Sequence, residues 1–264
     1  MERQKIKEAV VKANCALELK RKIVGVKFLF TEEEFEKAEA KKLEAKMPYC
    51  VMVKLGMSGL AVKAKFDNFG CLGSARALGI LEIDEMVSSG RHYGRLGLYQ
   101  DLTVAKNVLK NVTMCQHKAY GVMIKPVEEY YEEPDVVIIV SSPYNVMRLV
   151  QGYTYIFGCK TSYKMTGNQA LCSECTAYPF ESNDINVSLL CSGTRFMGGW
   201  DDNEMAMGIP FNKFVQVIDG LYATTNPTEP NKKKSEIETR LKEYGRTDLG
   251  IEYDKNYYTG LYLK

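Results

Sequence analysis

Two short stretches of the sequence share one pattern and decide the predicted fold. The first is FGCLGSAR at residues 69–76, and the second is LLCSGTR at residues 189–195. Both contain Cys-x-Gly followed by a small hydroxyl residue and an arginine, and a Glu-Met pair comes about one short helix later in each. The same features in the same order indicate an internal repeat, so we expect two similar units.

The similarity continues on both sides of these motifs. Cys50 precedes Cys71, and Cys172 precedes Cys191, at similar distances. Composition and apolar spacing predict strands at residues 24–28, 61–66, 120–125 and 185–189, and helices at residues 103–112 and 212–223. We therefore place repeat 1 at residues 23–118 and repeat 2 at residues 119–225, with an insertion at 134–166 that adds a strand (135–141) and a helix (144–157).

The predicted fold class is α+β, internally duplicated, with two pseudo-symmetric lobes whose mixed sheets are flanked by helices. Charged residues interrupt the apolar ones in residues 1–22, which predicts an N-terminal amphipathic helix in place of a signal peptide. The C-terminal tail, residues 226–264, contains a predicted helix at residues 235–244 that Ser235 caps. We expect residues 1–225 to form one compact domain.

Charge and hydropathy narrow the class of partner. The 35 Lys and Arg residues nearly balance the 33 Asp and Glu residues, for a formal net charge of +2. This balance gives no electrostatic argument for nucleic acid as a partner. No stretch approaches the roughly 18 consecutive apolar residues of a membrane span. We expect a cytoplasmic protein that binds neither nucleic acid nor membrane.

The eight cysteines are the most informative residues for function. A disulfide framework is not expected in a cytoplasmic chain of this length, which leaves buried thiols, metal or cluster ligands, or a reactive thiolate. Self-comparison reduces the eight cysteines to four: Cys50, Cys71, Cys172 and Cys191. A pseudo-twofold axis between the repeats would bring these four sulfurs together.

Four thiolates hold either a zinc ion or an iron–sulfur cluster. The wide spacing of the four cysteines favours a four-iron four-sulfur cluster over zinc, which prefers tight Cys-x2-Cys knuckles. Gly73 and Gly193 are expected where the backbone approaches the cofactor closely or adopts a positive φ. Arg76 and Arg195 are expected to offset the negative charge of the cluster.

The pattern leaves other interpretations open. Cys175 has no counterpart in repeat 1 and is either an alternative ligand in place of Cys172 or a resolving thiol. The cysteines could also be buried thiols in a non-redox protein that binds a small ligand. In a third hypothesis, Cys172 or Cys175 is the nucleophile of a thiol-dependent enzyme.

Several segments also carry a family resemblance. They are residues 24–27 (VGVK), Cys50, Cys71 with Gly73, residues 133–137 (EPDVV), Cys172, Cys191 with Gly193 and Arg195, and residues 208–210 (GIP). In these segments the chain resembles the uncharacterised ArCR family, a domain of unknown function found in archaea and anaerobic bacteria. The resemblance spans most of residues 20–223. It implies no established activity, supports the same four cysteines, and suggests an anaerobic setting that would suit an oxygen-sensitive cluster.

These observations predict a cytosolic iron–sulfur protein whose cluster is held by two cysteine pairs at the interface of the repeats. The cluster would act in electron transfer or in redox chemistry on a small anionic substrate. The expected partner is a small-molecule ligand or a redox protein. The sequence leaves open whether the protein forms a homo-oligomer. The sequence also leaves open whether the protein is an enzyme, such as an iron–sulfur oxidoreductase.

Overall fold

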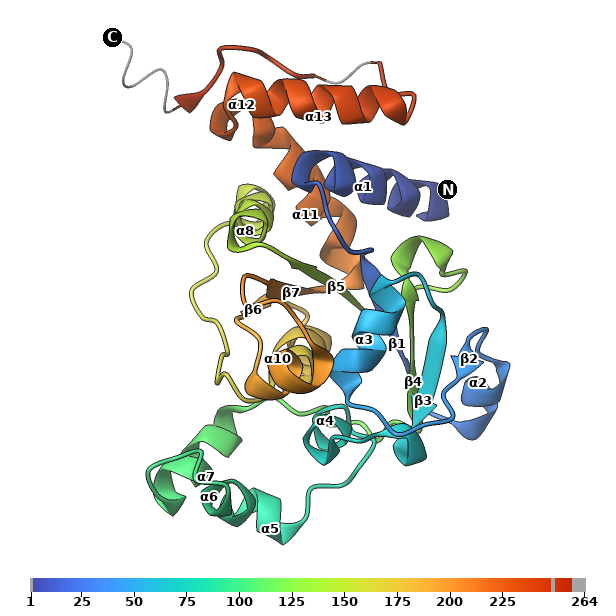
Figure 1. The fold of residues 1–264 in the computed structure, drawn as a ribbon, viewed down its shortest axis with the longest axis vertical. Coiled ribbons are helices and arrows are strands. Elements are labelled where there is room, and N and C mark those ends of the chain that lie inside the picture. Colours follow the sequence, from blue (N-terminus) through green and yellow to red (C-terminus); the bar gives the residue numbers. More distant parts are fainter. Residues whose placement is uncertain (1, 248–249, 258–264) are drawn as a thin grey trace. The chain divides into compact units, whose positions relative to one another are not determined.

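The computed structural model describes residues 2–247 and 250–257 and shows a mixed α+β fold (Figure 1). Residues 248–249 and 258–264, which belong to the expected C-terminal tail, lie outside the described residues. The chain divides into two units. Unit 1 comprises Met1–Lys20, Ser141–Thr161 and Asn212–Lys264, and unit 2 comprises Arg21–Val140 and Ser162–Phe211.

Unit 2 is built on a mixed sheet, which in the described chain has seven strands in the order β2-β3-β4-β1-β5-β7-β6. The strands are β1 (Val24–Leu29), β2 (Lys41–Lys42), β3 (Val62–Lys65), β4 (Gly121–Pro126), β5 (Val136–Ser141), β6 (Asn186–Ser188) and β7 (Met205–Pro210). In the centre, β1 pairs antiparallel with both β4 and β5, while β2 runs parallel to β3. The strands expected from β-branched and apolar composition are therefore confirmed, with small differences at their ends.

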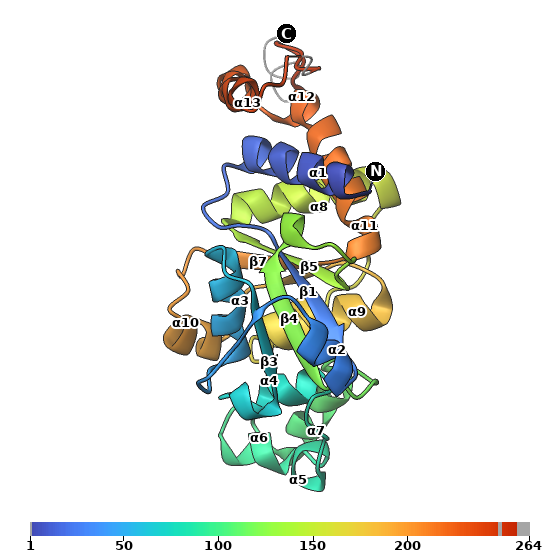
Figure 2. The same cartoon turned by 90° about the vertical axis from the view of Figure 1, so that its right-hand side faces the viewer.

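The central strands β1 and β4 present different residues to the two faces of the sheet, because successive side chains of a strand point in opposite directions. On one face, valine, isoleucine and phenylalanine side chains of both strands join the main hydrophobic core with helix α3 (Tyr49–Met57). On the other face, Leu29 and Met123 pack with Phe35 of helix α2 (Glu32–Lys37). Figure 2 shows α3 and α2 on opposite sides of these strands.

Short helices complete unit 2. They are α4 (Leu72–Ala77), α5 (Glu85–Ser88), α6 (Arg91–Arg95), α7 (Leu102–Asn111), α9 (Tyr178–Ser182), α10 (Ser192–Gly198), the 3-10 turns η1 (Phe66–Asn68) and η2 (Val127–Glu129), and the π-helix η3 (Ala170–Ala177). Helix α6 packs against both α5 and α7, and the three form a small group at the lower end of Figure 1. The π-helix is the least expected of these elements, since i→i+5 hydrogen bonding is rare and is concentrated at functional sites.

In the described part of unit 1, the regular elements are helices apart from the end of β5. Its helices are α1 (Glu2–Leu17), α8 (Pro143–Phe157), α11 (Phe211–Ala223), α12 (Thr225–Thr228) and α13 (Asn231–Glu243). A buried ion pair joins α8 to the end of α12, because Arg148 Nε donates to Glu229 Oε1 at 2.8 Å and both side chains are at most 3% exposed. Tyr144 donates a second hydrogen bond to Glu229 at 2.7 Å. The charges are thereby paired and hydrogen-bonded, as burial requires.

The expected repeats meet the structure at several points, but the duplication itself stays a prediction. Strands β1 and β4, which open the two expected repeats, are paired neighbours. The strands between the two cysteines of each copy differ in their neighbours, since β3 pairs with β4 whereas β6 pairs with β7. The two Glu-Met pairs also differ, because Glu85 begins helix α5 whereas Met205 begins strand β7.

Most expected helices are present, but the start of the tail helix was predicted wrongly. Helix α13 begins at Asn231, directly after its N-cap Pro230, and Ser235 lies inside it. Residues 231–234, which precede the predicted cap, are helical, and Lys234 is fully buried and donates to the Glu252 carbonyl oxygen at 2.7 Å. Proline fixes φ near the helical value, so the chain can enter the helix directly after Pro230.

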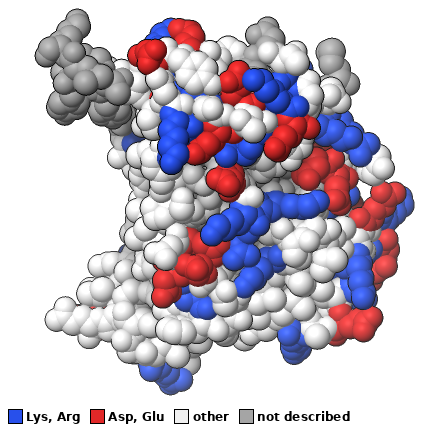
Figure 3. Space-filling view, turned by 45° about the horizontal axis from the view of Figure 1, so that its top comes forward, with Lys and Arg blue, Asp and Glu red and all other residues white. Residues whose placement is uncertain are grey.

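The surface agrees with the charge balance of the sequence. On the face seen in Figure 3, Lys and Arg side chains are interspersed with Asp and Glu side chains. Among the described helices, none combines the length and apolar composition that crossing a membrane requires.

Candidate functional site: a pocket lined by four cysteines

The four cysteines selected from the sequence line one pocket in unit 2. Cys50, Cys71, Cys172 and Cys191 all contribute to the wall of a cavity of about 280 Å³. Gly73 and Gly193 line it as well. We refer to this cavity as the four-cysteine pocket. Residues that are up to 141 positions apart, Cys50 and Cys191, are thus gathered at one place.

Cys71 and Cys191 occupy equivalent positions at the starts of two short helices. Cys71 is the N-cap of α4 and Cys191 is the N-cap of α10, both with extended backbone. The backbone N–H of Thr194 donates to Cys191 Sγ at 3.4 Å, and the Ser74 hydroxyl donates to the Cys71 carbonyl oxygen at 2.7 Å. The small hydroxyl residue of the shared motif is therefore the third helical residue and bonds back to the capping cysteine. Free N–H groups at a helix N-terminus favour negative charge, including that of a thiolate.

The motif glycines leave space above these two sulfurs. Neither Gly73 nor Gly193 has a positive φ, so of the two alternatives expected for these glycines only the close approach of the backbone to a cofactor stays a prediction. A Cβ added at Gly73 would lie 3.8 Å from Cys71 Sγ and 3.6 Å from the Tyr93 hydroxyl, both of which line the pocket. A Cβ at Gly193 would lie 3.9 Å from Cys191 Sγ. Glycine at both positions thus keeps the volume beside each thiol open.

The other two cysteines come from longer elements. Cys50 is the second residue of α3, and Cys172 lies in the π-helix η3. Cys175, three residues after Cys172, does not line the pocket; it is fully buried in the main core. In an α-helix these two residues would share a face, but the wider turn of a π-helix separates them. The structure therefore places Cys172, and not Cys175, at the pocket.

Buried polar contacts hold the π-helix in place. Glu174 accepts a hydrogen bond from the backbone of Thr166 at 2.6 Å and one from the Ser188 hydroxyl at 2.5 Å. On the pocket side, the Tyr49 and Thr176 hydroxyls are 2.9 Å apart. Hydrogen bonds to Ser188 of β6 and to Tyr49 of α3 thus fix the π-helix that carries Cys172. Such supporting contacts hold a site residue accurately in position.

The sulfurs influence one another electrostatically. Burial, and then the nearby sulfurs of Cys191 and Cys71, raise the pKa of the Cys50 thiol from 9.0 to about 11. Burial followed by the same two sulfurs raises the pKa of Cys172 well above its usual range. A metal that binds here must displace the protons of both thiols, because only thiolates are metal ligands.

Neither of the two arginines expected as charge partners lines the pocket. Arg195 donates to three backbone carbonyl oxygens, those of Leu189 at 2.9 Å, Glu204 at 2.8 Å and Asp201. Arg76 is 8% exposed and donates to Asp84 Oδ2 at 2.9 Å, while its Nε has no hydrogen-bond partner in the described chain. Arg195 thus stabilises the loop that follows α10. Of the two arginines, Arg76 is the one with an N–H group that no acceptor in the described chain uses.

Three pocket residues were missed by the sequence argument. The Gln169 side-chain N–H₂ donates to the Tyr93 hydroxyl, whereas its Oε1 is buried without a hydrogen-bond partner among the described residues. Thr194 lies with its hydroxyl oxygen 3.1 Å from Cys191 Sγ and also interacts with the Cys50 thiol. The sequence could have indicated Thr194 as a pocket residue, because it is the hydroxyl residue of the repeated motif. No sequence pattern marks Gln169 or Tyr93 as pocket residues.

Within residues 2–247 and 250–257, no group of three or more His, Cys, Asp or Glu side chains is placed to hold a metal ion. The four thiols line a cavity and do not converge on one point. The cysteines outside the selection lie elsewhere: Cys15 is in the small core of unit 1, Cys115 packs on the main core, and Cys159 is exposed.

Comparison with known proteins places the chain in a family but gives no activity. An uncharacterised protein of Methanocaldococcus jannaschii is 24% identical over 223 residues, which cover 84% of this chain and 95% of that protein. No solved structure matches the chain significantly. Residues 13–220, which include all four pocket cysteines and the elements that carry them, match the family described as Uncharacterised ArCR. The chain belongs to this ArCR family of unknown function.

Proposed function

We propose that this protein is a cytoplasmic iron–sulfur protein whose four-iron four-sulfur cluster is held by Cys50, Cys71, Cys172 and Cys191. The observation that carries the proposal is that these four cysteines, from four different elements, line one pocket. Four cysteine thiolates are the usual ligand set of such a cluster.

The surroundings of the sulfurs support a polynuclear cofactor. The cavity of about 280 Å³ leaves room between the thiols, and Gly73 and Gly193 keep side chains out of it. At the start of α10 the Thr194 N–H donates to Cys191 Sγ, whereas, among the described residues, the Cys71 side chain accepts no capping hydrogen bond at the start of α4. Such an N–H group stabilises the negative charge of a thiolate ligand. Arg76 adds one guanidinium with a free N–H near the Tyr93 side of the pocket.

The proposed role is one-electron transfer: Cys50, Cys71, Cys172 and Cys191 would hold the cluster, which would supply a one-electron carrier between a reduced and an oxidised partner. Leu96, Leu98 and Met197 line the pocket and are also exposed at the surface. Exposed apolar residues beside a buried site are typical of a surface that contacts a partner protein or an apolar substrate. A small oxidised substrate that enters the pocket would receive the electron directly and would make the protein an oxidoreductase.

Anaerobic purification tests the proposal. The protein should be brown, absorb broadly near about 400 nm and contain about four iron atoms per chain. Serine variants of the four pocket cysteines should each lose iron, whereas Cys159→Ser, at an exposed thiol outside the pocket, should keep it. A protein that stays colourless and free of iron after anaerobic treatment with iron and sulfide would refute the cluster. Colourless protein with bound zinc would refute it too.

A second candidate is a small-ligand site without metal. It is favoured by the unpartnered Oε1 of Gln169, which is 5% exposed in a pocket otherwise lined largely by apolar side chains. In that case the variant with all four cysteines replaced by serine would fold and still bind its ligand. The thiol-dependent enzyme is the least favoured hypothesis, because burial raises the pKa of both Cys172 and Cys175 and disfavours the reactive thiolate.

A further inference from the structure

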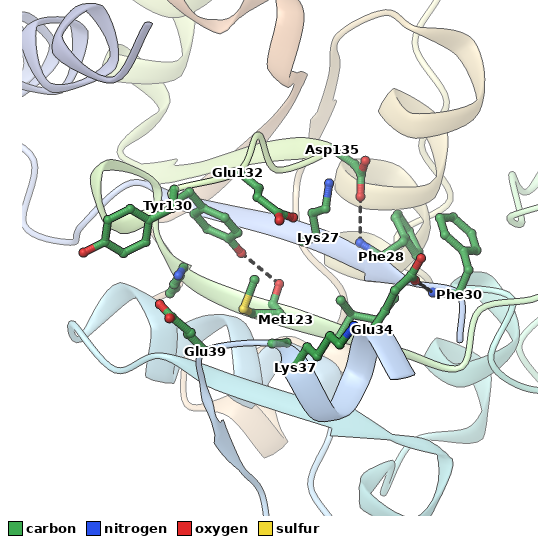
Figure 4. A pocket seen from close by; sticks show the side chains of 14 residues that line it. Lys27, Phe28, Phe30, Glu34, Lys37, Glu39, Met123, Tyr130, Glu132 and Asp135 are labelled. Carbon is green, nitrogen blue, oxygen red and sulfur yellow. Dashed lines mark hydrogen bonds between the residues drawn. The ribbon is translucent and has the colours of Figure 1, made fainter. Parts of the chain in front are cut away.

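A second cavity of unit 2, of about 450 Å³, lies on the α2 side of the sheet and shares no lining residue with the four-cysteine pocket. Its walls come from β1, β4, α2 and the segment between β4 and β5. Figure 4 shows this cavity with Met123 at its centre, Glu34 and Lys37 on the α2 side, and Lys27 beside Glu132 and Asp135.

Lys125 is the unusual residue of this cavity. Its side chain is 5% exposed and lines the cavity. Its ammonium lies 4.8 Å from the ring centroid of Tyr130 and 5.9 Å from that of Tyr131, and both tyrosines also line the cavity. In the described chain it has neither an ion pair nor a hydrogen bond. The residue is buried, but its ammonium is not among the buried polar atoms without a partner, so it faces the cavity and is free to pair with a ligand there.

Other lysines of this cavity and of the same face of the sheet already have hydrogen-bond or ion-pair partners in the protein. Lys63 donates to the carbonyl oxygens at the end of α2, that of Phe35 at 2.6 Å among them. Lys27 donates to the Glu133 carbonyl oxygen at 2.8 Å, and Lys37 pairs with Glu33 on the surface of α2. Lys125 therefore differs from its neighbours by lacking a protein acceptor.

The wall beside Lys125 is rigid and apolar. Gly25 is the sheet partner of Lys125, and a Cβ there would lie 2.7 Å from the Tyr130 ring, so glycine is required for the ring to pack here. The Tyr130 hydroxyl, 3.0 Å from the Gly25 carbonyl oxygen and 2.9 Å from that of Met123, fixes the ring. Leu29, Phe30 and Met123 extend the apolar lining.

Acidic residues limit the charge that a ligand can carry. Glu34, Glu39, Glu132 and Asp135 line the same cavity as Lys125. Glu34 and Asp135 already accept backbone N–H groups, the latter from Phe28 at 2.7 Å. With one free ammonium among these carboxylates, a dianion such as phosphate would be repelled more than it is attracted. A single carboxylate on an apolar body fits both the ammonium and the aromatic wall.

We propose that this cavity binds a small apolar monocarboxylate, whose carboxylate pairs with Lys125 and whose apolar body packs on Tyr130, Met123 and Leu29. The proposal is independent of the four-cysteine pocket. The buried Tyr130 ring covers one side of the Lys125 ammonium, and this apolar wall strengthens an ion pair in the cavity relative to one that is fully surrounded by water.

Titration calorimetry of the full chain with benzoate as the probe tests this site. Benzoate should bind one molecule per chain with a dissociation constant of about 1 mM or lower, and at least about tenfold more tightly than the neutral benzamide or than inorganic phosphate. Lys125→Met should weaken benzoate binding by about tenfold or more, because a charge-assisted hydrogen bond is lost. Lys65→Met is the matched control, since Lys65 lies on neighbouring strand β3 and does not line this cavity; it should bind as the wild type does.

Three results would overturn the proposal: no saturable binding of benzoate, equal affinity for benzoate and benzamide, or tighter binding of phosphate. The comparison of probes needs only the wild-type protein, so it decides the matter even if Lys125→Met fails to fold. If that variant folds, as its circular dichroism spectrum would show, and binds benzoate unchanged, the carboxylate does not pair with Lys125.

Discussion

In the metal-free protein, the raised pKa of Cys50 makes the free energy of unfolding fall as the pH rises. Replacement of Cys50 by alanine should remove this part of the pH dependence. In the folded chain, burial and the nearby sulfurs of Cys191 and Cys71 raise the pKa of Cys50 from 9.0 to about 11. The folded state therefore holds this proton more tightly than the unfolded state does. Its contribution to stability is complete below about pH 9 and is lost as the pH rises toward 11.

The size of the loss follows from the two pKa values. At pH 10 the unfolded thiol is deprotonated about ten to one, whereas the folded thiol of Cys50 is still protonated about ten to one. The free energy of unfolding therefore falls by about 1.4 kcal/mol between pH 7.5 and pH 10 through this group alone. The full shift of two pKa units corresponds to about 2.7 kcal/mol at higher pH.

Urea denaturation of reduced, metal-free protein measures the effect by far-ultraviolet circular dichroism. We expect the stability advantage of the wild type over Cys50→Ala to shrink by about 1.4 kcal/mol between pH 7.5 and pH 10. The comparison with alanine cancels the ionisation of lysines and tyrosines, which both proteins share. The stability difference between the wild type and Cys159→Ala should not shrink in this way between pH 7.5 and pH 10, because Cys159 is an exposed thiol. A constant advantage over Cys50→Ala would show that folding does not shift the pKa of the Cys50 thiol, and an advantage that grows toward pH 10 would show that folding lowers this pKa. Either result would refute the reasoning.

Three further substitutions test the packing around the site and in unit 1. Gly208→Ala should destabilise the protein by about 1–3 kcal/mol in denaturant titrations, because its Cβ would lie 2.2 Å from a carbonyl oxygen of the π-helix. The control is Gly94→Ala on α6, which should not destabilise the protein, because the nearest atom to its Cβ would be 3.7 Å away. Arg148→Met should cost about 3 kcal/mol, because the buried Glu229 would lose its buried guanidinium partner and keep only the Tyr144 hydroxyl and the more exposed Lys233. The variant that also carries Glu229→Leu should recover part of the loss. Gly73→Leu should prevent iron incorporation, because its Cβ meets nothing closer than 3.6 Å and the rest of the leucine side chain would extend into the pocket that Gly73 lines. Gly73→Ala, which adds only this Cβ, should leave the melting temperature nearly unchanged. Normal iron content in Gly73→Leu would contradict the placement of the cluster.

The sequence predicted the elements better than their assembly, for physical reasons that particular residues illustrate. Strand β5 and helix α8 were expected where they occur, because a β-branched apolar run and a Ser142-Pro143 helix start are local signals. The π-helix was not expected, since its pattern depends on tertiary contacts of Glu174 and Tyr49 that no local spacing reveals.

The candidate site was predicted in part. The repeated motif selected the four cysteines that line the pocket, because a helix N-cap and a small residue beside it leave a local pattern at both Cys71 and Cys191. The arginines of the same motif do not line the pocket, and Arg195 instead satisfies carbonyl oxygens of the following loop. A long side chain can reach several places from one backbone position, so sequence spacing does not determine what it contacts.

Lys125 shows the opposite case, in which a functional candidate left no signal in the sequence. A lysine within an apolar strand is ordinarily taken as a residue of the solvated face, and Lys27, Lys63 and Lys65 repeat the same alternation on neighbouring strands. Only the fold shows that α2 and the Tyr130 segment cover this face and bury Lys125. The same strands thus direct Val26 and Ile124 to the core that supports the four-cysteine pocket and Lys125 to the second cavity. Because the two pockets lie on different faces of one sheet and share no lining residue, a ligand in one need not displace any side chain of the other.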